Sequence, residues 1–122
     1  MNKVLQGVIP AVITSFNEDG KIDENKMENV LNFLVDKVNG LFICGTYGSG
    51  PIMDNSQRQH LAELILKKTY NKIPVIVNIS SICADMAIEL AKHAEYAGAS
   101  ILSSTPPYYY RYNENEILLY YE

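Results

Sequence analysis

Residues 41–51 read LFICGTYGSGP, an apolar run that leads directly into a glycine-rich loop. Short apolar runs of this kind are typical of strands that are buried inside a sheet. The three glycines, Gly45, Gly48 and Gly50, let the loop backbone turn sharply and approach a ligand closely. This strand with its loop is the unit that the rest of the chain repeats.

Apolar stretches of strand length alternate with segments of helical periodicity along the whole chain. The expected strands cover 8–13, 41–44, 74–79 and 99–103, and the expected helices lie around 27–38, 61–68 and 87–94. The strands begin about thirty residues apart. This alternation and spacing predict parallel βαβ units.

Residues at the expected helix ends support these boundaries. Asp23 precedes the first helix, and Asp54 with Gln57 three residues later reads as a capping box for the second. Gly40 and Gly98 follow the first and third helices, where a C-cap glycine belongs.

A fourth helix is expected from residue 113 or 114, and its apolar residues continue to Glu122 without a closing cap or glycine. We therefore expect residues 1–122 to be part of a larger domain, truncated in this helix. A half-built parallel sheet leaves strand edges and apolar surface uncovered, which native proteins avoid. A small natural domain with four strands is the alternative.

Composition narrows the class of protein. The 122 residues are 48% hydrophobic, as in ordinary globular domains. A net charge of -4 argues against a nucleic-acid partner. No apolar run is long enough for a transmembrane helix, and no signal peptide is evident. Cys44 and Cys83 form no CxxC pair and are expected to be buried, reduced thiols in the cytoplasm, with a disulfide as the alternative.

Hydroxyl side chains dominate the segments that follow the expected strands, where parallel α/β folds place their active sites. These segments hold Thr14 and Ser15, then 45–51, then Asn78, Ser80 and Ser81, and finally 103–110. None carries a His, Cys or carboxylate cluster of the kind that binds a metal. The pattern indicates a site that hydrogen-bonds an oxygen-rich substrate without a metal, and His60 and His93 are read as ordinary helix residues.

The loop from Gly45 to Gly50 is the strongest signal in these segments. Its glycines can turn backbone N–H groups toward an anion, and Thr46 and Ser49 add hydroxyl donors. It lacks the lysine of a phosphate-binding P-loop, so a carboxylate is the better candidate ligand. A plain turn between a strand and a helix is the alternative.

The run Tyr108, Tyr109 and Tyr110 is the second signal. A positioned tyrosine can pass protons, because its hydroxyl both donates and accepts hydrogen bonds. Aromatic packing at an oligomer interface is the alternative, and both roles are compatible.

Four motifs in this order resemble the dihydrodipicolinate synthase and N-acetylneuraminate lyase family. They are GVIPAVITSF at 7–16, CGTYGSGP at 44–51, AIELAKHAEYAGA at 87–99 and TPPYYYR at 105–111. The resemblance covers the chain from about Gly7 to Glu122. It implies an α/β fold that is a partial TIM (β/α)8 barrel, with 1–122 as the N-terminal half of one domain and about its first four βα units.

The resemblance also implies an activity. Members are class I aldolase-type enzymes in which a lysine forms a Schiff base with pyruvate or a related 2-keto acid, and a carbon–carbon bond is made or broken. No metal or organic cofactor is implied, because the imine itself is the electron sink. The family's lysine lies on the sixth strand, beyond this chain, so these 122 residues alone are expected to be inactive.

By position, Thr46 matches a loop hydroxyl that joins a tyrosine proton relay in the family. Thr46, Tyr47 and Gly48 match the loop that binds the keto-acid carboxylate, although most members have Thr or Ser in place of Tyr47. Tyr109 matches the second tyrosine of a P-Y-Y motif and, in relatives, reaches into a neighbouring subunit's site. This implies a homo-oligomer, a dimer or tetramer, in the cytoplasm, with no nucleic-acid or membrane partner.

Two departures leave the substrate open. Ser49 stands where the synthases usually have Glu, and Ser15 stands where Pro is usual. The Ser49 variant resembles the sugar-acid aldolases of the family, such as 2-keto-3-deoxygluconate aldolase. Cleavage of a 2-keto-3-deoxy sugar acid or of an N-acetylneuraminate-type substrate is therefore one alternative to the synthase reaction. A half-barrel that binds a ligand without chemistry is the other.

Overall fold

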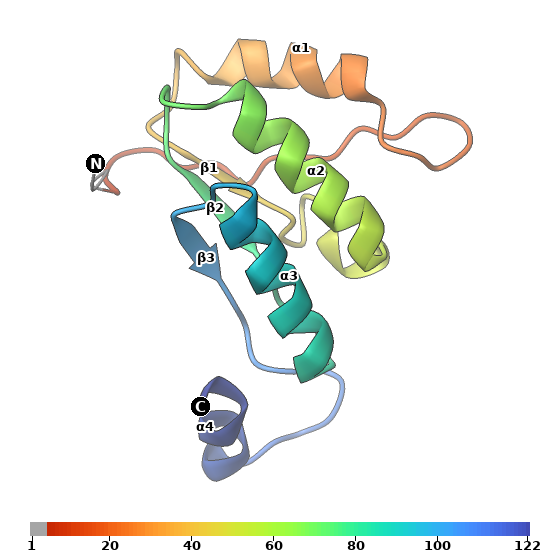
Figure 1. The fold of residues 1–122 in the computed structure, drawn as a ribbon, viewed down its shortest axis with the longest axis vertical. Helices are drawn as coiled ribbons and strands as arrows, with labels where there is room; N and C mark the ends of the chain where they lie inside the picture. Colours follow the sequence, from red (N-terminus) through yellow and green to blue (C-terminus); the bar gives the residue numbers. More distant parts are fainter. Residues whose placement is uncertain (1–4) are drawn as a thin grey trace.

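The alternation of strands and helices expected from the sequence is present in a computed structural model that describes residues 5–122. The elements follow one another along the chain as in Figure 1. They are α1 (Glu24–Leu34), β1 (Leu41–Ile43), the short 3-10 helix η1 (Gly50–Ile52), α2 (Asn55–Lys68), β2 (Val75–Asn78), α3 (Ala84–Tyr96), β3 (Ile101–Ser103) and α4 (Glu114–Tyr121).

The three strands form one parallel sheet in the order β1-β2-β3, so neighbours in the sequence are neighbours in space. Leu41 pairs with Val75, and Ile76 pairs with Ile101. In Figure 1, α2 and α3 lie side by side in front of the strands, with α1 beside α2. Sequential parallel strands joined by helices are the building pattern of a (β/α) barrel.

The core lies between the strands and these helices. Leu41, Ile43, Val75 and Val77 alternate along β1 and β2 and are buried. They meet the apolar stripes of the helices, formed by Met27 and Leu31 of α1, Leu61, Ala62 and Ile65 of α2, and Ala87, Leu90 and Ala94 of α3. Each large side chain buried in this way contributes about 1.5–3 kcal/mol. The stripes expected from the sequence are therefore the core-facing surfaces.

The expected strand at 8–13 is wrong as a regular element. The stretch makes a single parallel bridge to β1, between Ala11 and Phe42. Val12 donates its amide to Phe42, and Phe42 donates to Pro10, at 2.8 and 3.0 Å. The ladder goes no further because Pro10 has no N–H to donate and the carbonyl of Val8 accepts from Asn39 instead.

The helix ends agree with the sequence in three of four expected caps. Asp23 accepts the amide of Lys26 at 3.0 Å, and Asp54 with Gln57 forms a complete capping box. Gly98, with φ +94°, follows α3 in a Schellman arrangement, where Ala99 donates to Ala94 at 2.9 Å. Gly40 was wrongly expected to cap α1. The helix ends at Leu34 and its C-cap is Val35, five residues before Gly40.

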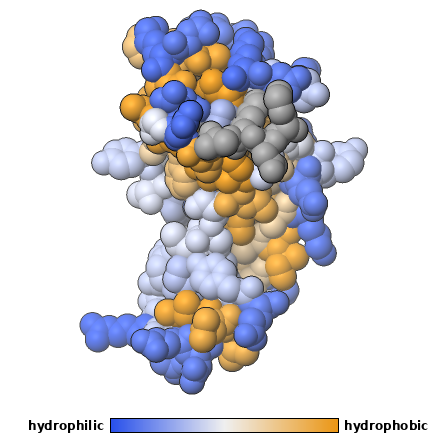
Figure 2. Space-filling view, turned by 90° about the vertical axis from the view of Figure 1, so that its left-hand side faces the viewer, coloured by the Kyte–Doolittle hydropathy of each residue, from blue (hydrophilic) through white to orange (hydrophobic). Residues whose placement is uncertain are grey.

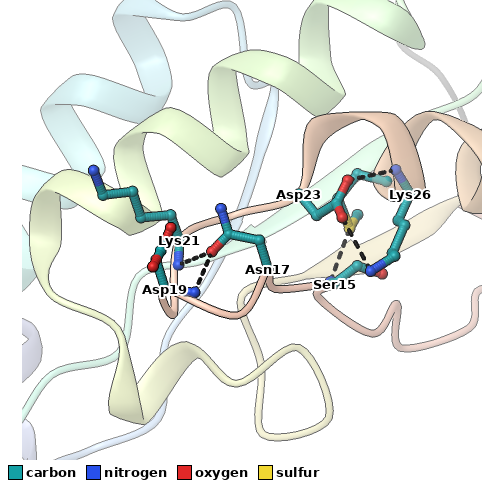
Figure 3. A network of polar contacts seen from close by, with 7 residues as sticks. Ser15, Asn17, Asp19, Lys21, Asp23 and Lys26 are labelled. Carbon is teal, nitrogen blue, oxygen red and sulfur yellow. Dashed lines mark hydrogen bonds and ion pairs between the residues drawn. The ribbon is translucent and has the colours of Figure 1, made fainter.

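The loop before α1 is held by its own polar side chains (Figure 3). The Asn17 carbonyl Oδ1 accepts the amides of Asp19 and Lys21, at 3.0 and 2.9 Å. The Asp23 carboxylate contacts Lys26 both at its amide and at its ammonium group. Hydrogen bonds to Lys26 hold the pKa of the Asp23 carboxyl below its usual value. The turn therefore delivers the chain into α1 in a fixed direction.

Large hydrophobic side chains remain exposed outside this core, and Figure 2 shows a face on which apolar side chains gather. Val8, Ile13, Ile52 and Leu119 are each more than half exposed. An exposed apolar surface of this kind fits a sheet that forms only part of a barrel. None of the helices formed by residues 5–122 has the length and hydropathy needed to cross a membrane.

Candidate functional site

An open pocket of about 360 Å³ lies at the carboxyl ends of the strands, where parallel α/β folds bind their ligands. It is lined by Phe42, Gly45, Thr46, Pro51, Asn78, Ser80, Thr105 and Tyr108. These residues come from β1 and its glycine-rich loop, from the end of β2, and from the segment after β3. The hydroxyl-rich segments expected from the sequence therefore do meet at one place.

Close backbone packing explains two of the loop's glycines. A Cβ atom on Gly48 would stand 2.9 Å from the carbonyl oxygen of Val12. A Cβ atom on Gly50 would collide with the carbonyl oxygen of Cys44. In both cases the obstacle is backbone, which cannot move aside as a flexible side chain would. Glycine is needed here for space, since neither residue has a positive φ.

The backbone amides of this loop divide into two groups. Ser49 donates to the Thr46 carbonyl and Gly50 donates to the Gly45 carbonyl, each at 3.0 Å. Within the part of the chain that the structure describes, the amides of Thr46, Tyr47 and Gly48 make no hydrogen bond. Three consecutive unpaired amides beside a pocket are the donors that an anion such as a carboxylate needs.

The structure brings together only some of the expected site residues. Thr46 lines the pocket, whereas Gly48 is buried and does not line it. The side chains of Tyr47 and Tyr109 are 76% and 72% exposed and do not line it. Tyr108, the residue before Tyr109, does line the pocket together with Thr46.

Tyr109 instead packs against its neighbour in the tyrosine run. Its ring meets that of Tyr110 edge to face, with centroids 4.9 Å apart, and both rings face outward. The start of the segment that bears them is joined to α4, because Tyr121 donates its hydroxyl to the Ser104 carbonyl at 3.1 Å. Exposed aromatic rings on an ordered segment are typical of a surface that meets another chain.

Sequence reasoning missed Arg58, a buried arginine of α2 that supports the pocket from behind. Its Nη1 donates to the Ser80 carbonyl at 2.8 Å and its Nη2 to the Asn78 carbonyl at 2.7 Å. The available signal was its position, three and four residues before Leu61 and Ala62 on the buried face of the helix. A charged residue on an apolar stripe is worth attention, because charges are rarely buried without a partner.

A second link joins the ends of β2 and β3. The Asn78 side chain accepts the amide of Ser80 at 3.2 Å, and the Ser80 hydroxyl accepts the amide of Thr105 at 2.7 Å. Asn78, Ser80 and Thr105 all line the pocket. One side of the pocket is thus a connected set of hydrogen bonds between two strands.

The two cysteines are free and lie in different surroundings. Cys44 is buried at the end of β1, and burial raises the pKa of its thiol to about 11, although Arg58 acts in the opposite direction. A protonated thiol is a poor nucleophile. The expectation that both thiols are buried is wrong for Cys83, which is exposed because it stands at the solvent-facing start of α3.

Both histidines join helices on the outside of the molecule. His60 meets Glu24 of α1 at 2.9 Å, and His93 meets Glu63 of α2 at 2.8 Å. Across residues 5–122, no three His, Cys, Asp or Glu side chains lie close enough together to hold a metal ion. No lysine of that range lines the pocket.

Parallel strands joined by helices, with a pocket at their carboxyl ends, are the pattern of part of a (β/α)8 barrel. The sequence of this chain matches the profile of the Dihydrodipicolinate synthetase family over residues 4–122. The chain belongs to this family, whose members are carbon–carbon lyases and synthases.

Three curated relatives carry three different names within the family. A probable 2-dehydro-3-deoxy-D-pentonate aldolase of Escherichia coli K12 is 36% identical over 98% of this chain and 40% of its own length. A 4-hydroxy-tetrahydrodipicolinate synthase of Bartonella bacilliformis is 34% identical over 93% and 39%. An N-acetylneuraminate lyase of Histophilus somni is 30% identical over 98% and 42%. The chain thus spans about 40% of the length of these relatives.

Solved structures agree with this assignment. A prophage protein of the dihydrodipicolinic acid synthase family from Escherichia coli K12, in complex with pyruvate, superposes with a TM-score of 0.90 at 29% identity, covering 94% of this chain and 39% of that one. Dihydrodipicolinate synthase from Aquifex aeolicus gives 0.90 at 28% identity, covering 96% and 40%. The expected fold class, a partial TIM barrel, is confirmed.

Proposed function

We propose that these residues form the keto-acid-binding part of a barrel enzyme that makes or breaks a carbon–carbon bond through a Schiff base with pyruvate or a related 2-keto acid. One observation carries the proposal. The three unpaired amides of Thr46, Tyr47 and Gly48 stand beside an open pocket at the carboxyl ends of the strands. The pyruvate bound to the structural relative from Escherichia coli supports the choice of anion.

In this proposal the glycine-rich loop holds the substrate carboxylate. The Thr46 hydroxyl and the backbone amides from Thr46 to Gly48 donate hydrogen bonds to its oxygens. Amide donors do not depend on the side chain, so Tyr47 can replace the Thr or Ser of other members without loss of this contact. The exposed Tyr47 ring leaves the pocket open.

Proton transfer is assigned to the tyrosine run. Tyr109 moves protons in the site of a neighbouring subunit, and the exposure of its ring leaves it available for that contact. Tyr108 lines the pocket of its own chain. The enzyme is accordingly a homo-oligomer, a dimer or tetramer, and we assign it to the cytoplasm, without nucleic-acid or membrane partners.

The Schiff-base lysine of the proposed enzyme lies outside residues 1–122. The imine withdraws electrons from the reacting carbon, so the proposal invokes no metal or organic cofactor. The 122 residues contribute binding and proton transfer, and by themselves they form no imine.

The test is chemical trapping on the protein produced from the complete reading frame that contains these residues. That protein is incubated with pyruvate and borohydride, digested, and analysed by mass spectrometry. We expect an adduct of pyruvate size on one lysine outside residues 1–122. An adduct on a lysine inside this range, or no adduct at all, contradicts the proposal, and no adduct favours a half-barrel that binds a ligand without chemistry.

A second reaction is favoured by one loop residue. Ser49, followed by Gly50 and Pro51, resembles the sugar-acid aldolases, and the Escherichia coli relative at 36% identity is named as a pentonate aldolase. Turnover of a 2-keto-3-deoxy sugar acid is to be compared with condensation of pyruvate and aspartate semialdehyde. The substrate with the higher kcat/KM decides between cleavage and synthesis.

A further inference from the structure

Arg58 is the one arginine of the chain that is withdrawn from solvent. Its side chain leaves the second turn of α2, is 6% exposed, and ends beneath the carboxyl end of β2. There it donates to the carbonyls of Asn78 and Ser80 at 2.7 and 2.8 Å, and Nη2 lies 3.5 Å from the Asn78 side-chain oxygen. A single planar group thus fixes two carbonyls that are two residues apart.

Burying the Arg58 guanidinium costs free energy, which indicates that its hydrogen bonds have a structural role. Nε of Arg58 is buried without a hydrogen-bond partner, and within residues 5–122 no carboxylate pairs with the guanidinium. Burying an unpaired charge is unfavourable compared with burying an apolar side chain. Leucine or methionine at position 58 would instead extend the apolar stripe of Leu61 and Ile65. An apolar side chain, however, could donate to neither carbonyl.

The hydrogen bonds of the Arg58 guanidinium lead to one side of the pocket, while the Arg58 backbone carbonyl accepts a contact of 4.0 Å from the Cys44 thiol at the end of β1. Asn78 and Ser80 line the pocket, and the Ser80 hydroxyl accepts the amide of Thr105, three residues before Tyr108. The guanidinium itself does not line the pocket. None of its hydrogen bonds reaches the carboxylate-binding loop from Gly45 to Gly50.

We propose that Arg58 is a positioning residue: its guanidinium fixes the end of β2 so that Ser80 can hold the segment from Thr105 to Tyr108 against the pocket. The proposal rests on the proposed function in so far as that segment bears Tyr108 and leads directly into Tyr109, the residue to which proton transfer is assigned. It separates two parts of the site. The glycine-rich loop binds the carboxylate without Arg58, whereas the tyrosine segment depends on it.

The first test is amide hydrogen exchange, which needs no activity. Arg58→Met keeps a long apolar side chain and removes the donors. In the complete protein, the amides of Ser80 and Thr105 should exchange about tenfold faster, while those of β1 keep their rate. Arg58→Lys retains the charge but not the paired N–H donors of the guanidinium. Its exchange rates at Ser80 and Thr105 should lie between those of the unaltered protein and those of Arg58→Met. Acceleration that is uniform over the molecule, or none at Ser80 and Thr105, overturns the proposal.

A smaller change covers the case in which Arg58→Met fails to fold. Ser80→Ala removes only the hydroxyl that accepts the Thr105 amide, so exchange at Thr105 should again rise about tenfold. An unchanged rate at Thr105 overturns the link between Arg58 and the tyrosine segment. Arg111→Lys is the matched control, because Arg111 is exposed and should leave both amides unchanged.

The second test separates binding from turnover. In the complete enzyme, Arg58→Lys should lower kcat about tenfold and leave the KM for the keto acid within about twofold. A rise in KM with an unchanged kcat contradicts the assignment. If the unaltered protein forms no pyruvate adduct, the proposed function fails, yet the exchange experiment still decides the role of Arg58. If the adduct forms and exchange is unaffected, only Arg58 is wrongly assigned.

Discussion

The Thr14 hydroxyl donates a hydrogen bond of 2.5 Å to the carbonyl oxygen of Gly48, across a sequence separation of 34 residues. The contact ties the segment after the first apolar stretch to the middle of the glycine-rich loop. Together with the close approach of Gly48 to Val12, it holds the loop against that segment. The three unpaired amides of the loop are therefore presented from a fixed backbone.

Removing this hydroxyl should loosen the loop. Thr14→Val keeps the shape of the side chain and leaves the Gly48 carbonyl without its partner, so we expect a loss of about 1 kcal/mol in the free energy of unfolding. Thr14→Ser retains the donor and should lose less. Urea unfolding of the two variants measures this difference, and equal losses would show that the hydroxyl is not the cause.

Gly50 should tolerate no side chain. The Cβ of Gly50→Ala would collide with the Cys44 carbonyl oxygen, and backbone must shift to relieve the contact, at a cost of about 3 kcal/mol. Gly20→Ala is the control, since Gly20 has φ +73° and open space around it and should cost only about 1 kcal/mol. Thermal unfolding compares them, and a Gly50→Ala variant no less stable than Gly20→Ala would contradict the packing argument.

The buried thiol of Cys44 predicts a loss of stability at alkaline pH. Burial raises its pKa from 9.0 to about 11, so between these values the unfolded chain releases a proton that the folded chain retains. The unfolded state is then favoured, and the free energy of unfolding falls as pH rises from 9 to 11, by about 2–3 kcal/mol. Below pH 9 this contribution is fully present.

Cys44→Ala should remove this part of the pH dependence, although it also leaves a small cavity. Urea unfolding at several pH values between 8 and 11 compares it with Cys83→Ala, which removes an exposed thiol and keeps Cys44. In the native protein a thiol reagent should modify Cys83 and reach Cys44 only after unfolding. If the free energy of unfolding changes equally with pH in the two variants, the Cys44 thiol is not the cause of the pH dependence.

Local signals in the sequence predicted the fold well. The cap of α2 could be read directly, because Asp54 and Gln57 lie three residues apart and satisfy each other's amides. The apolar stripes were also correct, apart from Ile88 of the third helix, which is 50% exposed. The strand at 8–13 was overestimated, because its apolar run was given more weight than Pro10, whose missing N–H helps to limit the pairing to a single bridge.

The candidate site could be predicted only in part, since its side chains meet through tertiary contacts. The Thr46 loop follows its strand directly and was found. Arg58 was not, because its partners lie 20 and 22 residues away and a lone arginine in a helix usually points to solvent. The direction of the Tyr47 ring likewise depends on how the loop packs, which no local pattern of residues records.

Within the glycine-rich loop, the hydroxyl and the backbone should respond differently to substitution. Thr46→Val removes a pocket-lining hydroxyl and, in the complete enzyme, should raise the KM for the keto acid about tenfold. Tyr47→Phe should leave it within about twofold, because the ring is exposed and the amide remains. Steady-state kinetics tests the pair, and a larger effect at Tyr47 would place its hydroxyl in the substrate contact.

The 122-residue chain alone should not react with the keto acid. Its described lysines stay outside the pocket, and an imine needs an amine beside the bound carbonyl. Incubation with pyruvate and borohydride should therefore leave its mass unchanged. Size-exclusion chromatography of the same sample gives a second comparison. With its apolar surface uncovered, the chain should associate or pack loosely. A compact, monodisperse protein without an adduct would instead favour the half-barrel that binds a ligand without chemistry, and an adduct would show that a lysine of this chain is the nucleophile.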